Sequence, residues 1–88
     1  MSDQEEPAGW RVGVNDYDMN RNILRTTYYL VAIPDETAMI AAMYDQNKMN
    51  GGVIGYQKPI AAAVLKEYSV KENEIYEWKV VMPRGSEN

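Results

Sequence analysis

The sequence predicts a small single domain of the α+β class, in which an antiparallel sheet of about four strands carries one or two helices packed on one face. Three observations lead to this fold class. The chain has 88 residues, which suffices for one hydrophobic core. Segments near both ends of the chain have the alternation, or the β-branched and aromatic content, of strands. Between them, a segment rich in alanine and methionine predicts a helix.

The domain is expected to span residues 10–82, flanked by two polar segments. Residues 1–9 are predicted to form a disordered acidic tail, and residues 83–88 a disordered C-terminal tail. The N-terminal segment has no apolar core of the kind found in secretory signals. No apolar stretch approaches the roughly 20 residues that cross a bilayer. We therefore expect a soluble, cytoplasmic protein with no membrane contact.

The first two strands are predicted to form a hairpin. Trp10, Val12 and Val14 alternate with smaller or charged residues, which is the two-residue period of a strand. Residues 23–33, with the sequence ILRTTYYLVAI, predict a long second strand. The polar residues 15–22 between them, NDYDMNRN, favour a turn, so an antiparallel pair is expected.

A helix is predicted over residues 36–47. Asp35 is well placed to cap its N-terminus, and the Asn50-Gly51-Gly52 segment allows the positive φ that helix C-termini commonly need. Residues 53–57 then predict a short strand, which Pro59 interrupts.

Residues 60–68 fit two structures. Ile60, Val64, Leu65 and Tyr68 have helical spacing, but the segment could also extend as a strand into a hairpin turn. We favour the helix, which gives the order ββαβαβ; the alternative is ββαβββ. The last strand is predicted over residues 75–82.

In that last strand, the two-residue period places four side chains on one face. They are Tyr76, Trp78, Val80 and Met82.

The spacing of Asp16, Asp18 and Asn20 resembles the start of a calcium-binding loop. Such a loop needs glycine at its sixth position and a bidentate glutamate at its twelfth, which here are Arg21 and Thr27. The flanking segments also predict strands, not helices. We therefore interpret the segment as a hairpin turn and expect no metal site.

The chain contains no cysteine and no histidine. This excludes thiol catalysis, disulfides and thiolate zinc sites, and removes the usual general base and the commonest metal ligand. We expect no cofactor, and an enzyme is the less favoured class. With 9 basic and 13 acidic residues the net charge is −4, which disfavours binding to nucleic acid.

The aromatic composition points to contact surfaces. Seven tyrosines and two tryptophans, with no phenylalanine, provide apolar rings with polar groups, as interfaces do. The expected function is a small acidic protein–protein interaction module: an accessory subunit, an inhibitor of a partner enzyme, or a self-associating structural protein. Equally, the tyrosines could simply occupy half-buried positions of a small domain.

Two other functions stay open. One is a small ligand-binding protein or enzyme whose pocket is lined by Tyr, Glu and Arg. The other is a single-stranded nucleic-acid binder that would use Arg21, Arg25, Tyr28 and Tyr29, since aromatic rings beside arginines can stack on bases.

The second strand predicts where a partner binds. One face carries Leu24, Tyr28, Leu30 and Ala32, and the other carries Ile23, Tyr29, Val31 and Ile33. Two short helices would cover one face, so the other is expected to meet a second copy or another protein. The candidate interface residues are Arg25, Tyr28, Tyr29, Val31, Tyr76 and Trp78.

Overall fold

The structure is a computed structural model that describes residues 7–82. Its elements follow the order β1 (Gly9–Tyr17), β2 (Ile23–Val31), α1 (Glu36–Asp45), β3 (Val53–Ile60), α2 (Ala62–Glu67) and β4 (Ile75–Val81). The α+β class and the order ββαβαβ are confirmed, and the ambiguous segment contains a helix. The predicted tails lie outside the described residues except for residues 7–9, of which Gly9 already belongs to β1.

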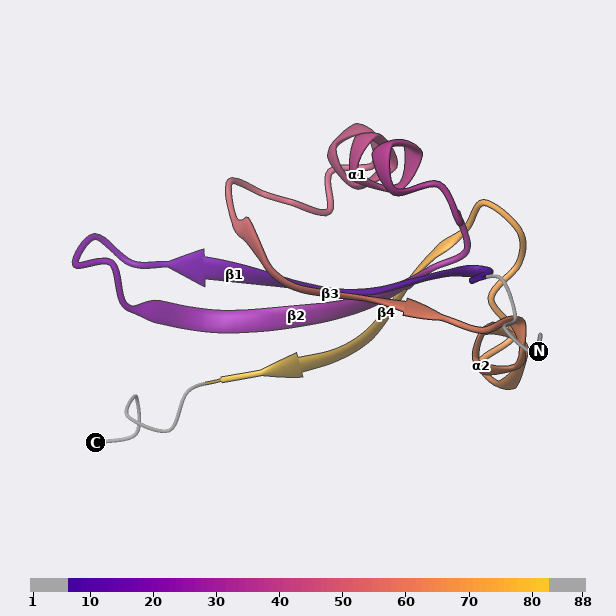
Figure 1. Cartoon of the computed structure of the whole chain (residues 1–88). Coiled ribbons are helices and arrows are strands. Elements are labelled where there is room, and N and C mark those ends of the chain that lie inside the picture. The colour runs from indigo at the N-terminus through magenta and orange to yellow at the C-terminus, as the bar shows by residue number, and fades with distance from the viewer. Residues whose placement is uncertain (1–6, 83–88) are drawn as a thin grey trace.

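The four strands form one antiparallel sheet (Figure 1), and their order in it is β3-β1-β2-β4. β1 and β2 are the central pair, joined by the predicted hairpin turn. In that turn, the Asp18 carboxylate accepts hydrogen bonds from the backbone N–H groups of Asn20 and Asn22, at 2.8 and 2.9 Å. Arg21 takes the left-handed conformation, with φ of 68°. The side chain of Asp18 therefore stabilises the turn itself.

Helix α1 connects β2 to β3 across one face of the sheet. The Asp35 carboxylate caps it by accepting from the Ala38 N–H at 2.9 Å, as the sequence predicts. The helix ends at Asp45, two residues earlier than expected. The chain then turns through Asn47 and Asn50, both with positive φ, before β3 begins.

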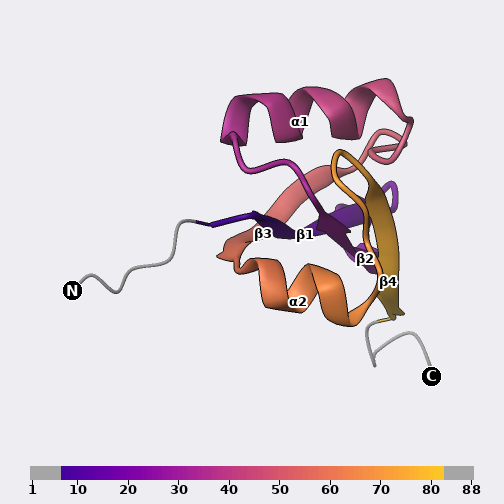
Figure 2. The same ribbon diagram turned by 90° about the vertical axis from the view of Figure 1, so that its right-hand side faces the viewer.

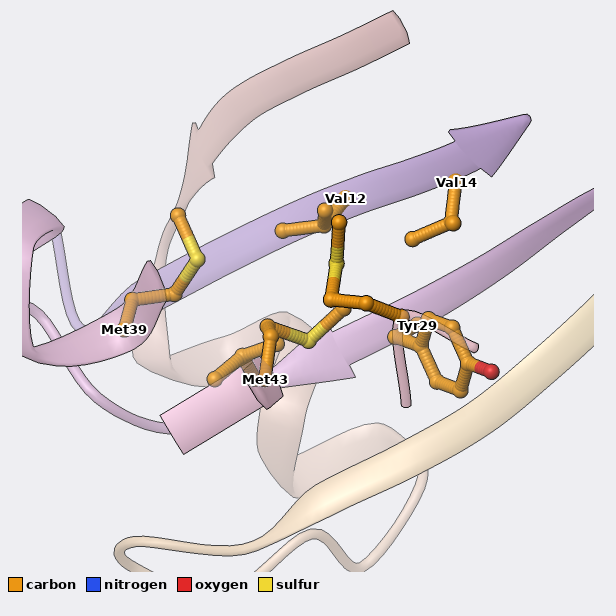
Figure 3. Packing of buried hydrophobic residues seen from close by; sticks show 7 residues of the cluster. Val12, Val14, Tyr29, Met39 and Met43 are labelled. Atoms are coloured by element: carbon orange, nitrogen blue, oxygen red, sulfur yellow. The ribbon is translucent and has the colours of Figure 1, made fainter. Parts of the chain in front are cut away.

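The larger core lies between α1 and the sheet (Figure 3). Met39 and Met43 are one helical turn apart, so both point from α1 toward the sheet, where neither is exposed to solvent. They pack in a cluster of buried residues that comprises Val12, Val14, Tyr29, Val31, Met39, Met43 and Met49.

Helix α2 lies on the opposite face of the sheet from α1 (Figure 2). We expected the helices to share one face, and here the structure differs. The reason lies in β2, whose C-terminal half is apolar on both sides: Tyr29 and Val31 face α1, whereas Leu30 faces α2. Leu65 from α2 and Val70 beyond it cover this second side. Each apolar side thus receives its own helix.

The two outer strands also differ in detail from the sequence prediction. β3 continues through Pro59 to Ile60, because an edge strand tolerates a residue without an N–H group.

In β4, Trp78 is an extra residue: Tyr28 pairs with Lys79, but the adjacent Tyr29 pairs with Glu77. This bulge shifts the alternation, so Val80 pairs with Thr27 and does not share the face of Tyr76. The four side chains expected on one face are therefore divided between two.

Candidate binding surface

The sheet face opposite α1 is only partly covered. Helix α2 has six residues and lies at the end of the sheet where β1 begins, away from the β1–β2 turn (Figure 1). Beyond α2, this side of the sheet presents aromatic and basic side chains. We call this surface the aromatic face and define it by Arg11, Tyr28, Tyr56, Lys58, Trp78 and Lys79.

Aromatic rings from three strands meet on the aromatic face. The ring centroid of Tyr28, in β2, lies 5.9 Å from that of Tyr56 in β3 and 6.1 Å from that of Trp78 in β4. Both pairs are edge-to-face, with interplanar angles of 76°. Tyr68, at the end of α2, continues the cluster, 6.2 Å from Trp78 and 6.0 Å from Tyr76. The rings support one another by contacts that are favourable beyond simple burial.

A glycine in β1 makes the contact between Tyr28 and Tyr56 possible. Strand β1 lies between β2 and β3, and Gly13 is in register with both tyrosines. A Cβ atom on Gly13 would lie 2.9 Å from Cε1 of Tyr28, so the Tyr28 ring occupies the space above the glycine. Any larger residue at this position would separate the two rings.

Two of the positive charges of the aromatic face lie close to Trp78, and the third lies on β3, at the other edge of the sheet. Cζ of Arg11 lies 4.7 Å from the Trp78 ring centroid, and Nζ of Lys79 lies 5.2 Å from it. Both distances are within the range of a cation–π interaction. Lys58 stands next to Arg11, its partner in the β1–β3 register, and is exposed.

One hydrogen-bond donor of Arg11 has no acceptor among the described residues. This donor is its Nε atom, which is buried. The aromatic ring of Trp78 is the neighbour that compensates for part of the lost hydration of the guanidinium.

The two faces of the sheet differ in charge. The strands contain two carboxylates, Asp16 and Glu77, and both lie on the α1 side, in register with Arg25 and Tyr29. The aromatic face therefore carries three cations and no strand carboxylate. In a protein whose net charge is −4, this region is locally positive.

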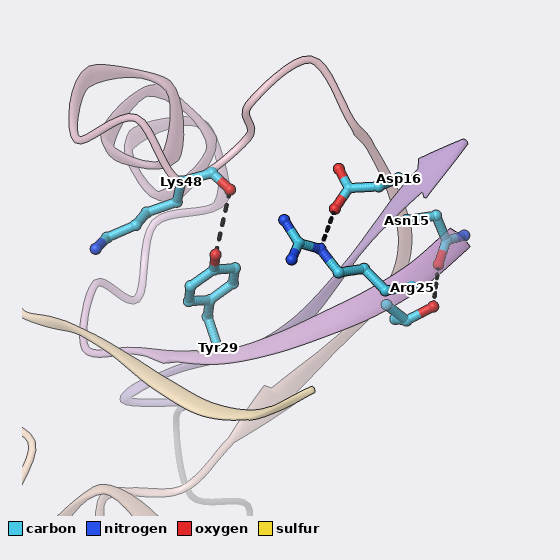
Figure 4. Close-up of polar contacts among 6 residues, drawn as sticks. Asn15, Asp16, Arg25, Tyr29 and Lys48 are labelled. Carbon is cyan, nitrogen blue, oxygen red and sulfur yellow. Dashed lines mark hydrogen bonds and ion pairs between the residues drawn. The ribbon is translucent and has the colours of Figure 1, made fainter. Parts of the chain in front are cut away.

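On the α1 side, the polar groups satisfy one another (Figure 4). Nε of Arg25 donates to the Asp16 carboxylate at 2.9 Å, and this contact raises the pKa of Arg25. The Tyr29 hydroxyl donates to the carbonyl oxygen of Lys48 at 3.3 Å. Burial raises the pKa of Tyr29, and the negative charges of Glu77 and Asp16 raise it further.

The six interface candidates from the sequence fall into two groups. Tyr28, Tyr76 and Trp78 lie on the aromatic face or next to it. The other three lie on the α1 side. Tyr29 and Val31 are buried there in the core, whereas Arg25 is exposed and pairs with Asp16.

The residues considered for nucleic-acid binding are also dispersed. Arg21 lies in the β1–β2 turn, and Tyr28 and Tyr29 point to opposite sides of the sheet.

Sequence reasoning missed four of the six residues that define the aromatic face. Arg11 and Gly13 were assigned only to the polar side of a strand, and Tyr56, Lys58 and Lys79 were not singled out. The two-residue period of β1 does place Arg11 and Gly13 on one face. Their neighbours, however, follow from the strand order β3-β1-β2-β4, which no local pattern contains.

A shallow groove of about 450 Å³ lies beside α2. Its charged lining residues are Lys66 and Glu72, and the rest of its lining is apolar: Ala8, Ala32, Pro34, Ala62, Leu65 and Val70. Binding pockets usually combine apolar walls with convergent polar groups that fix a ligand's orientation. No tyrosine or arginine lines this groove, so it lacks the Tyr, Glu and Arg combination expected of a pocket.

Two further features bear on the class of site. Within residues 7–82, no cluster of three or more acidic side chains is arranged to hold a metal ion. Neither helix in that range has the length and apolar character needed to cross a membrane.

Comparison with known proteins gives no relative for this chain. No family model matches it, and no curated protein or solved structure matches it either. Its function is therefore inferred from the chemistry of its own surface.

Proposed function

We propose that this protein is a protein–protein interaction module that binds its partner through the aromatic face. The observation that carries the proposal is the cluster of Tyr56, Tyr28 and Trp78, which crosses three strands of the sheet. Only its Trp78 end packs against the core under α2. Tyr56 keeps 38% of its surface exposed. Tyrosine, tryptophan and arginine are the residue types enriched among interface hot spots.

The cluster is also pre-organised for binding. Each ring is held by an edge-to-face contact with its neighbour, and Tyr28 is fixed above Gly13. A partner would therefore meet rings whose side-chain entropy is already reduced, which lowers the cost of association. An accessory subunit, an inhibitor of a partner enzyme and a self-associating protein would each use such a surface.

Binding of single-stranded nucleic acid is the second candidate. Aromatic rings next to Arg11, Lys58 and Lys79 are the combination that stacks on bases and contacts phosphates. Stacking requires accessible ring faces, however. Both Arg11 and Lys79 already engage the π-surface of Trp78, which favours a protein partner over nucleic acid.

The test is affinity capture from the source cells with the full chain, comparing the wild type with Tyr56→Ser and Tyr44→Ser. Tyr44 is a matched control, because it is a tyrosine on α1 with 61% of its surface exposed. We expect the wild type and Tyr44→Ser to retain the same partner, and Tyr56→Ser to lose it. If the chain self-associates, light scattering should show the same pattern in the mass. Equal retention by all three proteins, or equal loss from both variants, would refute the proposal.

A further inference from the structure

We propose that the partner segment recognised by the aromatic face is an acidic stretch of polypeptide, whose carboxylates pair with Arg11, Lys58 and Lys79. This inference rests on the proposed function and adds the chemistry of the partner to it. Three observations support it. They are the separation of charge between the two sides of the sheet, the fixed guanidinium of Arg11 with its unpaired Nε, and the arrangement of the aromatic rings.

The first argument is charge complementarity. Among the described strands, every carboxylate lies on the α1 side, where Asp16 is paired with Arg25. No carboxylate of residues 7–82 forms an ion pair with the three cations of the aromatic face. These cations therefore have charge available for a partner. The net charge of −4 does not oppose this at contact, because charges more than about 8–10 Å away are largely screened at physiological ionic strength.

The second argument comes from Arg11. Its guanidinium is held over the Trp78 ring at 4.7 Å, and its buried Nε has no acceptor. A guanidinium that is already partly dehydrated and fixed in position loses less hydration and entropy when it binds a carboxylate. Arginine pairs with a carboxylate through two parallel hydrogen bonds, which also fixes the direction of approach.

The third argument separates a peptide from a nucleic acid. The rings of Tyr56, Tyr28 and Trp78 stand edge-to-face, with 76° between neighbouring planes. A row of stacked bases requires ring faces that point outward, whereas this arrangement turns rings against one another. Apolar side chains of a peptide can pack between such rings while its carboxylates reach the cations at the edges.

The test is fluorescence anisotropy with two labelled probes, a decapeptide of alternating glutamate and alanine and an oligothymidylate of ten nucleotides. In an extended peptide, alternate residues point to one side, so the glutamates can approach one surface together. The proteins are the wild type, Lys58→Glu, Lys79→Glu and the matched control Lys48→Glu. Lys48 lies on the α1 side and undergoes the same change of charge.

We expect the acidic peptide to bind the wild type at low salt and to bind Lys58→Glu and Lys79→Glu about tenfold more weakly, roughly the effect of losing one close charge pair. Lys48→Glu should bind as the wild type does. The peptide can fail to bind at physiological salt, because salt screens this electrostatic attraction. The inference is still supported if, at low salt, Lys58→Glu and Lys79→Glu bind the peptide more weakly than the wild type.

Three outcomes would overturn the inference. They are no peptide binding at low salt, peptide binding that Lys48→Glu weakens as much as the other two variants, and tighter binding of the oligothymidylate than of the peptide. The capture experiment keeps the proposed function separate. If a partner is lost with Tyr56→Ser but is retained by Lys58→Glu and Lys79→Glu, the aromatic face is supported as the interaction surface. The inference that the partner segment is acidic is then refuted.

Discussion

The two sides of this sheet differ in how completely a helix covers them. On one side, the ten-residue helix α1 covers the sheet with Met39 and Met43, and the Asp16 carboxylate pairs with Arg25. On the other, the six-residue helix α2 covers one end only. Since a helix rises about 1.5 Å per residue, α2 is roughly 9 Å long and cannot reach across the sheet. Tyrosine and tryptophan occupy what it leaves uncovered.

The comparison explains why a chain without phenylalanine contains so many tyrosines. Tyr29 lies on the closed side, where its hydroxyl donates to the backbone carbonyl of Lys48. On the open side, Tyr28 is half-buried and Tyr56 is exposed, and their rings pack together. The closed side stabilises the fold, and the open side is the one we propose for binding.

The largest expected difference between the two sides is between Tyr29→Asp and Tyr28→Asp. Tyr29 is buried, so a carboxylate there would lie in the core, and we expect the variant to be unfolded. Tyr28 is half-buried at the open surface, so its variant should fold and lose partner binding. Circular dichroism and light-scattering mass measure both effects. Two unfolded variants, or two folded variants that still bind, would mean that the sides do not differ in this way.

A second prediction compares truncations to alanine on the two sides. Met39→Ala removes a fully buried side chain and should lower the free energy of unfolding by about 2–5 kcal/mol. Tyr56→Ala removes an exposed side chain and should cost about 1 kcal/mol or less. Urea unfolding of both variants gives the comparison. If Tyr56→Ala costs as much as Met39→Ala, the aromatic cluster is part of the core.

Gly13 provides a third prediction, since its missing side chain makes room for the Tyr28 ring. Gly13→Ala places a Cβ atom 2.9 Å from that ring and should cost about 1–3 kcal/mol, with a changed near-ultraviolet circular dichroism signal. In a Tyr28→Ser background, the ring is gone and most of this cost should disappear. A cost that is the same in both backgrounds would show that the ring is not its cause.

The smallest expected effect concerns pH. The folded state raises the pKa of Tyr29 above its ordinary value of 10.0, so the folded protein holds that proton more tightly than the unfolded chain. The stabilisation from Tyr29 is therefore complete below that value and is lost as the pH rises through the folded-state pKa. Urea unfolding at pH 8 and pH 11 should show a larger loss of stability for the wild type than for Tyr29→Phe. Equal losses would contradict this assignment.

Local sequence signals predicted the secondary structure well. The alternation of Trp10, Val12 and Val14, the cap at Asp35 and the Asx-rich turn around Asp18 each act over a few residues, and each is present in the structure. The apolar character of both sides of β2 was also evident. It implied a helix on each side, and α2 covers only one end of its side.

The candidate site was harder to predict, because it depends on contacts between distant strands. Tyr28 and Trp78 could be proposed from their residue type, but Lys79 joins them on this face only because a bulge at Trp78 moves it opposite Tyr28. Likewise, Tyr56 reaches Tyr28 only because β1 lies between their strands and carries Gly13 at that point. Strand order and bulges arise from the packing of the whole domain, which local periodicity does not encode.

The two tryptophans provide the most direct test, because they lie on opposite sides of the sheet. Trp10 packs against the α1 core, and its indole N–H donates to the carbonyl oxygen of Pro34 at 3.0 Å. Trp78 lies on the aromatic face. Their indole N–H groups give two signals in a ¹⁵N–¹H correlation spectrum, which Trp10→Phe and Trp78→Phe assign.

The measurement is a titration of the ¹⁵N-labelled protein with the glutamate–alanine decapeptide at low salt. We predict that the Trp78 indole signal shifts progressively toward saturation while the Trp10 signal stays in place. A Trp78 signal that does not move, or a Trp10 signal that moves as far, would contradict the claim that the aromatic face is the binding side of this protein.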